Sequence, residues 1–214
     1  MTTAGTLPEL QETTPLEALI ARRRTGEEPF HANGQPLDVR LLSFWQWACS
    51  EICGNALRGL IAEYLVAHAL ESVDTCRVEW DACDVRTAGG LKVEVKSSGY
   101  IQSWKQHRLS AISFDIAPKR GWDAATNILG DTVQRAADVY VFALHAHQVK
   151  ATADPLDVTQ WLFFVVPTAV LDGRHARQKR IGLESLRRLA GAPVAFAELR
   201  AAVAAFEVSR PCRG

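Results

Sequence analysis

The sequence lacks the features of a membrane or secreted protein. No segment reaches the roughly 20 consecutive apolar residues that a membrane-spanning helix needs. The N-terminus has no basic stretch followed by an apolar one, which is the pattern of a secretion signal. The chain has five cysteines, an odd number. Without a signal we expect these to be reduced thiols, and we expect a cytoplasmic location.

A structural zinc site is also not indicated. Cys49 and Cys53 lie one helical turn apart, which would place two thiols on one face of a helix. No Cys or His pair follows them at the spacing of zinc ligands, so the pattern favours small buried hydrophobic residues. The sequence contains no internal repeat and no low-complexity tract.

The chain has no excess of either charge, since 24 Lys and Arg balance 24 Asp and Glu. This weighs mildly against nucleic-acid binding, because proteins that bind nucleic acids are often basic. The charge is uneven, however, and basic residues collect at 86–120 and 174–188, where they would attract phosphates. For the second stretch, a solvated helix face is the alternative. The length of 214 residues and the hydrophobic fraction of 48% predict one domain at 39–214, after a loosely ordered arm at 1–38.

The segment 84–96 carries the strongest pattern in the chain. Apolar residues at 91, 93 and 95 alternate with charged ones at 92, 94 and 96, which is the period of a strand with one apolar face. Ala88-Gly89-Gly90 is predicted to form a three-residue turn with a glycine in the left-handed region. In that register Asp84 falls opposite Glu94. A two-residue turn at Gly89-Gly90 would instead place Asp84 opposite Val95.

Two opposed carboxylates need an explanation, because like charges with Cβ atoms about 4.5–5.5 Å apart repel each other. A cation with a preference for oxygen ligands, such as Mg²⁺, would make the pair favourable, and Lys96 would add an amine on the same face. The alternative is an ordinary solvated face. The residues that follow, Ser97-Ser98-Gly99, favour a site, because small polar and flexible residues suit close approach to a phosphate backbone.

Residues 44–71 read as one long helix or two abutting ones. Asn55, Gly59 and Glu63 recur every four residues and form a stripe on it. A glycine inside a helix costs about 1 kcal/mol relative to alanine, so this glycine indicates close packing. Glu63 is a candidate third carboxylate. The alternative is that it lies on the surface near Arg58.

The helix with Glu63, the strand with Asp84 and the segment Glu94-Val95-Lys96 together resemble the PD-(D/E)XK nuclease superfamily. That fold is shared by many restriction endonucleases and Holliday-junction resolvases. The resemblance implies an α/β protein with a restriction-endonuclease-like α-β-β-β-α-β core and a central mixed sheet flanked by helices. One departure is that Cys83, not proline, precedes Asp84. Asp81 is a competing first carboxylate, but it falls on the opposite face of a strand and lies farther from Glu94 along the chain.

The resemblance implies a metal-dependent nuclease that hydrolyses phosphodiester bonds, most simply in DNA, in repair, restriction or anti-phage defence. Asp84 and Glu94 would bind Mg²⁺ or Mn²⁺ with help from Glu63, and Lys96 would orient or deprotonate the attacking water. A homodimer is a further expectation from the resemblance. The alternative is an adaptor or nucleic-acid-binding module that keeps the fold but does not cleave.

Nucleic-acid contacts are predicted around this site. Gln102 and Lys105 follow the hairpin in a cluster of polar, aromatic and basic residues, which can stack on bases and pair with phosphates. The same cluster contains Trp104, whose role stays open between packing and base stacking. The remaining predicted contacts are small polar residues near the acids: Asn55, Ser97 and Ser98.

Overall fold

The computed structural model describes residues 18–79, 81–123 and 126–208. The helices are α1 (Leu41–Ala48), α2 (Asn55–Ala69), α3 (Thr168–His175), α4 (Leu183–Ala190) and α5 (Leu199–Val208). The strands are β1 (Pro29–Ala32), β2 (Gln35–Arg40), β3 (Val85–Arg86), β4 (Lys92–Gly99), β5 (Ser113–Asp115), β6 (Lys119–Asp123), β7 (Ile128–Gln134), β8 (Val139–His145), β9 (Trp161–Pro167) and β10 (Arg180–Gly182). Short 3-10 helices lie at Lys150–Thr152, Val158–Gln160 and Phe196–Glu198.

A mixed four-stranded sheet forms the centre of the molecule, in the order β3-β4-β8-β9. Strands β4 and β8 are parallel, whereas β3 pairs with β4 and β9 pairs with β8 in antiparallel fashion. Every residue of β8 is buried. Its sequence, VYVFALH, is the nearly continuous apolar run expected of a strand covered on both faces. The predicted mixed α/β fold with a central mixed sheet is confirmed.

The connection between the two parallel strands differs from the predicted core. Parallel neighbours need a crossover of a dozen or more residues, commonly a helix. Here residues 100–138 make that crossover with β5 and the β6–β7 hairpin, and the described part of this segment contains no helix. The predicted order α-β-β-β-α-β is therefore wrong at its second helix. The chain fills that layer instead with α3 and α4, which follow the last sheet strand.

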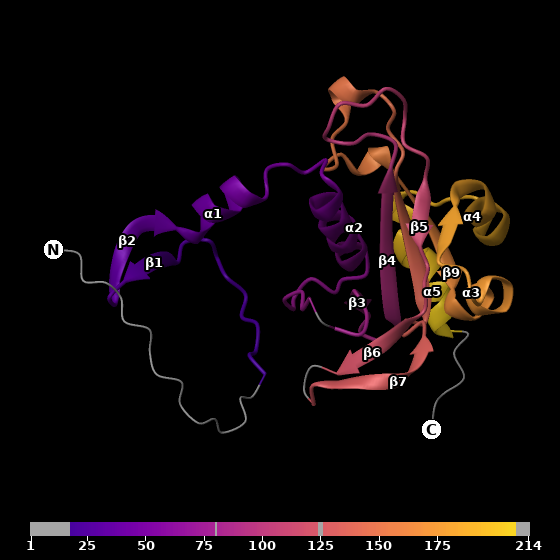
Figure 1. Cartoon of the computed structure of the whole chain (residues 1–214), viewed down its shortest axis with the longest axis horizontal. Helices are drawn as coiled ribbons and strands as arrows, with labels where there is room; N and C mark the ends of the chain where they lie inside the picture. Colours follow the sequence, from indigo (N-terminus) through magenta and orange to yellow (C-terminus); the bar gives the residue numbers. More distant parts are fainter. Residues whose placement is uncertain (1–17, 80, 124–125, 209–214) are drawn as a thin grey trace.

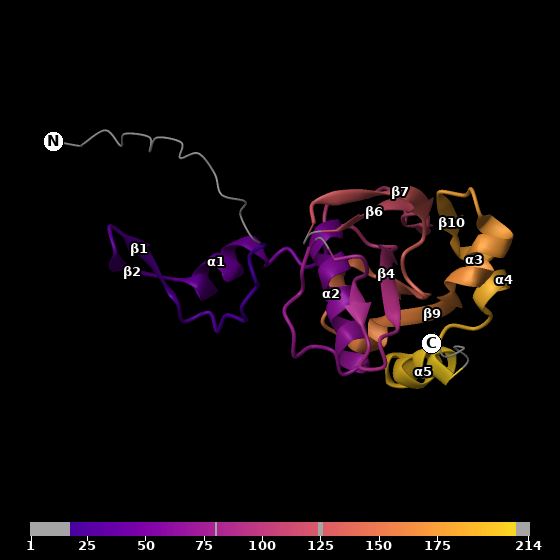
Figure 2. The ribbon, with the colours of Figure 1, turned by 90° about the horizontal axis from the view of Figure 1, so that it is seen from below.

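Each face of the sheet has its own hydrophobic core. Helices α2 and α5 pack on one face through residues such as Val66 and Val203. Strands β5 and β10 and helices α3 and α4 cover the other, with Phe114, Ile181 and Leu186 at the contact. Figure 2 shows the sheet between these two layers. Alternate residues of β4 thus point to different layers, and this decides which of its side chains lie together.

The N-terminal part stands apart from this body. Strands β1 and β2 form a hairpin that leads into α1, and the three elements lie to one side of the sheet in both ribbon views (Figures 1 and 2). The predicted helical segment 44–71 is two helices, because residues 49–54 form a turn closed by the Gly54 N–H donating to the Glu51 carbonyl at 3.0 Å. Across the described residues, no helix has the length and apolar character of a membrane span.

Candidate active site

The hairpin β3–β4 adopts the predicted register. Val85 pairs with Val93 and Arg86 with Lys92. The Thr87 N–H donates to the Leu91 carbonyl at 3.0 Å, so the turn consists of residues 88–90. Gly90 has a φ of +78°, which is the left-handed region where a side chain is costly and glycine is favoured. The sequence left a two-residue turn as an alternative, and the structure selects the three-residue turn, in which the Thr87 hydroxyl also donates to Glu207 of α5.

Asp84 immediately precedes the first residue of β3 and is held against β4. Its Oδ2 accepts a hydrogen bond from the Val95 N–H at 2.7 Å. This side-chain bond links the two strands of the hairpin at a position where their backbone pairing has ended. As a result, the Asp84 carboxylate lies in the electrostatic field of both Glu94 and Lys96.

Glu94 and Lys96 share one face of β4. Val93 and Val95 belong to the core under α2, so the residues between and after them point to the opposite layer. The Lys96 ammonium donates to Glu94 Oε1 at 2.5 Å, and the two side chains are only 21% and 19% exposed. The structure thus brings together the two acids and the amine that the sequence singled out.

Burial and charge shift the ionisation of this group. Burial, and next the negative charge of Glu94, raise the pKa of Asp84 to about 6, although the Val95 N–H and Lys96 act in the opposite direction. For Lys96, burial works to lower the pKa, but the charge and hydrogen bond of Glu94 together with Asp84 outweigh it and raise the pKa. Lys96 is therefore a protonated ammonium at neutral pH, beside a carboxyl that ionises at unusually high pH.

Glu63 reaches the same neighbourhood from α2, but it has its own cationic partner. The Arg77 Nε–H donates to Glu63 Oε2 at 2.5 Å, and this hydrogen bond raises the pKa of Arg77. The negative charge of Glu63 also contributes to the raised pKa of Asp84. Arg77 lies in an irregular segment before the hairpin, and no periodic pattern in the sequence marks it as a neighbour of the site.

The other sequence candidates lie at different distances from these acids. Asp81, the competing carboxylate, is exposed and pairs loosely with Arg86 at 3.9 Å. Asn55 is exposed at the start of α2, where its Oδ1 accepts from Arg58 at 2.5 Å. Ser98 shares the face of Lys96, whereas Ser97 points to the α2 side, and its buried Oγ finds no hydrogen-bond partner among the described residues.

Gln102 corrects one prediction, because its side chain lies inside the protein. It is 7% exposed. Its amide nitrogen donates to the Gly99 carbonyl at 3.0 Å and to Ser110 Oγ at 3.1 Å, and its Oε1 accepts from Arg58 at 3.3 Å. The side chain holds the segment after β4 in place and has no free edge for a nucleic acid.

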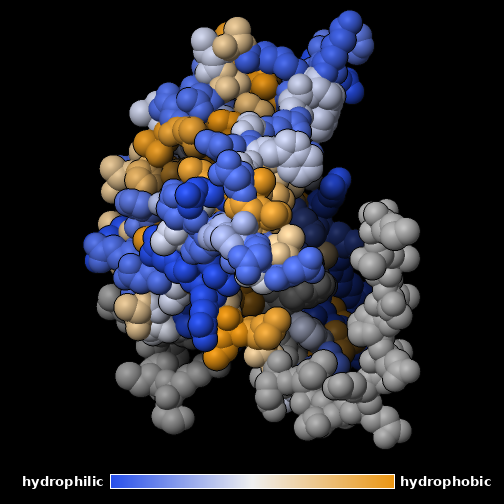
Figure 3. All heavy atoms as spheres, turned by 90° about the vertical axis from the view of Figure 1, so that its left-hand side faces the viewer, coloured by the Kyte–Doolittle hydropathy of each residue, from blue (hydrophilic) through white to orange (hydrophobic). Residues whose placement is uncertain are grey.

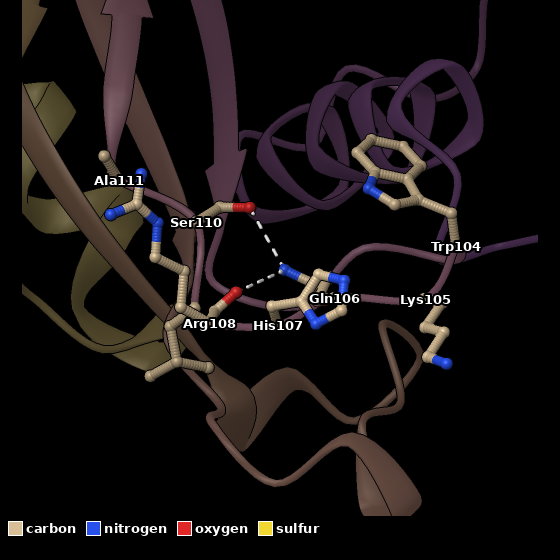
Figure 4. Close-up of a pocket in the computed structure, with 8 residues that line it drawn as sticks. Trp104, Lys105, Gln106, His107, Arg108, Ser110 and Ala111 are labelled. Atoms are coloured by element: carbon tan, nitrogen blue, oxygen red, sulfur yellow. Dashed lines mark hydrogen bonds between the residues drawn. The ribbon is translucent and has the colours of Figure 1, made fainter.

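Lys105 and Trp104, by contrast, are exposed on the same segment. Residues 104–111 line an open groove of about 710 Å³. Figure 4 shows the Gln106 amide turned inward, where it donates to Ser110 and to the Arg108 carbonyl, while Trp104 and Lys105 project away from that pair. The groove has a hydrogen-bonded polar base and a basic, aromatic rim.

The donor set of the acid cluster bears on metal binding. Across the described residues, no group of three or more His, Cys, Asp or Glu side chains is arranged to hold a metal ion. Asp84 and Glu94 remain as a pair whose mutual repulsion a cation would relieve. Mg²⁺ is commonly held by one or two carboxylates with water completing its shell, so these two residues fit such an ion, and Glu63 would first have to leave Arg77.

Comparison with known proteins places the chain in a family. No curated protein matches it at a significant level. The family model described as bacteriophage T4 endonuclease IV matches residues 40–178. That range contains α1, α2, the whole hairpin with Asp84, Glu94 and Lys96, and the central sheet. Because the match covers more than half of the chain, the protein belongs to the bacteriophage T4 endonuclease IV family.

Proposed function

We propose that the protein is a divalent-metal-dependent endonuclease that hydrolyses phosphodiester bonds in DNA, with a PD-(D/E)XK type of site. Membership of a family named for an endonuclease supports a nuclease acting on DNA. The observation that carries the proposal is the grouping of Asp84, Glu94 and Lys96 at one edge of the sheet, with Asp84 fixed by the Val95 N–H.

In this proposal Asp84 and Glu94 hold Mg²⁺ or Mn²⁺, and Glu63 joins them when it releases Arg77. A divalent cation at such a site supplies an activated water and stabilises the charge that develops on phosphoryl oxygens. The raised pKa of Lys96 favours a role as a fixed positive charge that orients the scissile phosphate and the water, rather than as a base. Lys105 and Trp104 then contact the nucleic acid beyond the site.

One observation favours a second candidate, a non-catalytic nuclease-fold module. Two of the three acids, Glu94 and Glu63, already carry cationic partners, and the described residues offer no ready-made group of three ligands. A site used only to support the fold would have this appearance. The two candidates differ in whether a cation competes successfully with Lys96 and Arg77.

Cleavage of supercoiled plasmid and of single-stranded DNA, each with Mg²⁺ or Mn²⁺, tests the proposal. Wild type is compared with Glu94→Ala, Lys96→Ala and the matched control Asp81→Ala, which removes an exposed acid three residues before Asp84. We expect metal-dependent cleavage that the first two variants lose and the control retains. Cleavage that survives both substitutions refutes the site. No cleavage of any nucleic acid, with no change of melting temperature on adding Mn²⁺, supports the non-catalytic module.

A further inference from the structure

The N-terminal arm, defined here as the described residues 18–48, has almost no core of its own. Among these residues only Gly26 is buried. A lone two-stranded hairpin is marginally stable in water, and so is an isolated helix much shorter than about 12 residues. The arm consists of one such hairpin and the eight-residue helix α1. It therefore needs a stabilising surface that the chain as described does not provide.

The arm exposes large apolar side chains instead of burying them. Phe44 and Trp47 form an aromatic pair on α1 with ring centroids 6.5 Å apart, and Trp47 is 83% exposed. The exposed large apolar residues of the arm are Leu19, Ile20, Phe30, Leu37, Val39, Leu42, Phe44 and Trp47. Figure 3, which views the molecule from the side of the arm, shows hydrophobic side chains at the surface among polar ones.

The amount of exposed apolar surface is that of a protein interface. Large side chains bury roughly 150–250 Å² each when fully covered. With the exposures observed for these eight residues, roughly 800 Å² is open to solvent, which is about what one partner contributes to a standard interface.

The charge of the arm argues against nucleic acid as its main partner. Residues 18–48 contain four arginines and three acidic residues, a net charge of only one. Contacts to a phosphate backbone depend on dense basic residues, whereas the aromatic and aliphatic residues of this arm suit a protein surface.

The body of the same chain carries an uncovered apolar face of the matching kind. On the outer side of α2, Leu60 and Tyr64 lie four residues apart and so on one face, and they are 39% and 58% exposed. The hairpin and α1 do not cover them, because these elements stand off the body in both ribbon views (Figures 1 and 2), although Arg23 of the arm donates to the Val73 carbonyl after α2 at 3.3 Å. The same chain therefore exposes apolar side chains on the arm and on α2, and the two surfaces are suited to contact each other in a pair of chains.

We propose that the arm docks on a second copy of this chain, with Phe44 and Trp47 of each copy against Leu60 and Tyr64 on α2 of the other. A two-fold dimer uses the same contact twice, and residues 49–54 join the arm directly to α2. The inference goes beyond the proposed nuclease function and does not depend on it.

Molar mass in solution tests the proposal without DNA or metal, so its outcome is separate from that of the cleavage assay. The full chain is measured by sedimentation equilibrium at micromolar concentration as wild type, Phe44→Ser/Trp47→Ser, Leu60→Ser/Tyr64→Ser and the control Val149→Ser/Leu156→Ser. The control removes two equally exposed apolar side chains elsewhere on the body. We expect the mass of two chains for wild type and control, and of one chain for both patch variants, with a cooperative thermal unfolding transition retained in all four proteins.

Photo-cross-linking identifies the surface that the arm contacts. A benzophenone amino acid is placed at Trp47, and labelled and unlabelled chains are mixed before irradiation. We expect mixed-isotope cross-links to the tryptic peptide 59–77, which contains Leu60 and Tyr64. A single-chain mass for wild type, a dimer that persists in both patch variants, or cross-links confined to one chain would each overturn the proposal. DNA affinity lost in the Phe44→Ser/Trp47→Ser variant, with an unchanged mass, would assign the arm to nucleic acid instead.

Discussion

The Asp84 carboxylate accepts a hydrogen bond from the Val95 N–H at 2.7 Å, and this bond holds it against β4, where it interacts with the charge of Glu94. The same carboxylate is half-buried, and burial together with Glu94 raises its pKa to about 6. Without a cation the bond therefore holds a negative charge where the protein disfavours it. The charged Asp84 carboxylate lowers the free energy of unfolding, and a cation bound to it would raise that free energy again.

The first prediction concerns Asp84→Asn without divalent cations. The amide oxygen can still accept from Val95, but the unfavourable charge is gone, so the variant should be more stable well above pH 6, by about 1–3 kcal/mol. Because the folded-state pKa of Asp84 is raised from 3.8 to about 6, the folded wild type takes up the proton first as pH falls, and the advantage should disappear toward pH 4. Denaturant unfolding in chelator across this range measures it. A pH-independent difference would contradict the account.

The second prediction is that Lys96→Met destabilises the protein and inactivates it. Removing the ammonium leaves Glu94 half-buried beside Asp84 without its partner at 2.5 Å, which should cost about 1–2 kcal/mol. Cleavage should fall by roughly 10²–10⁴-fold, as for other positioned catalytic groups. Lys96→Arg is the control, since it keeps the charge but not the shape of the group; it should recover stability more fully than cleavage. Equal loss of both in Lys96→Arg would argue that Lys96 only supports the fold.

A third prediction separates two residues of the segment after β4. Gln102→Ala removes a buried amide bonded to Gly99, Ser110 and Arg58, so the free energy of unfolding should fall by about 1–3 kcal/mol. Lys105→Ala, at an exposed position, should change stability by less than about 0.5 kcal/mol but weaken DNA binding and lower its salt dependence by about one phosphate contact. Thermal melts and salt titrations of binding give both results. If Gln102→Ala weakened DNA binding without lowering stability, Gln102 would again be a candidate DNA contact.

The fourth prediction concerns acid sensitivity at His145. Burial, aided by the nearby charges of Arg58 and His147, lowers the pKa of His145. The unfolded chain therefore binds this proton more readily, and its contribution to stability is present above the unfolded-state pKa of about 6.5 and is lost as pH falls below it. His145→Gln should lose less stability than wild type between neutral pH and about pH 5, while His31→Gln, at an exposed position, should follow wild type. The raised pKa of Asp84 makes the folded protein more stable as pH falls, which is the opposite of the effect of His145. The effect of His145 is therefore measured as the difference between each variant and wild type at the same pH.

The sequence predicted those features that depend on local rules. A period of two and a pair of glycines predicted the hairpin and a left-handed glycine, and the structure selects the register with the three-residue turn over the two-residue alternative. The burial of β8 on both faces accounts for its continuous apolar run, whereas β9 is the edge strand of the sheet and keeps three partly exposed residues. The acid cluster follows from these local elements, since Asp84 and Glu94 belong to one hairpin.

Features that depend on distant contacts could not be predicted in this way. The ion pair of Glu63 with Arg77 joins α2 to a segment without periodicity. The inward turn of Gln102 depends on Arg58, which is 44 positions away. The sequence alone does not show whether a polar side chain in a loop forms its hydrogen bonds inside the protein or with a ligand. The missing second helix has the same cause, because a crossover can be built from strands as well as from a helix.

The hairpin also has a consequence for how such proteins diverge. All three central side chains lie within thirteen consecutive residues, and the turn that closes the hairpin is tied to α5 by the Thr87 hydroxyl, which donates to Glu207 Oε1. The long crossover at 100–138 can then gain or lose residues without disturbing the spacing of the acids. Relatives are expected to keep the chemistry of the hairpin constant and to vary what they cut through this crossover.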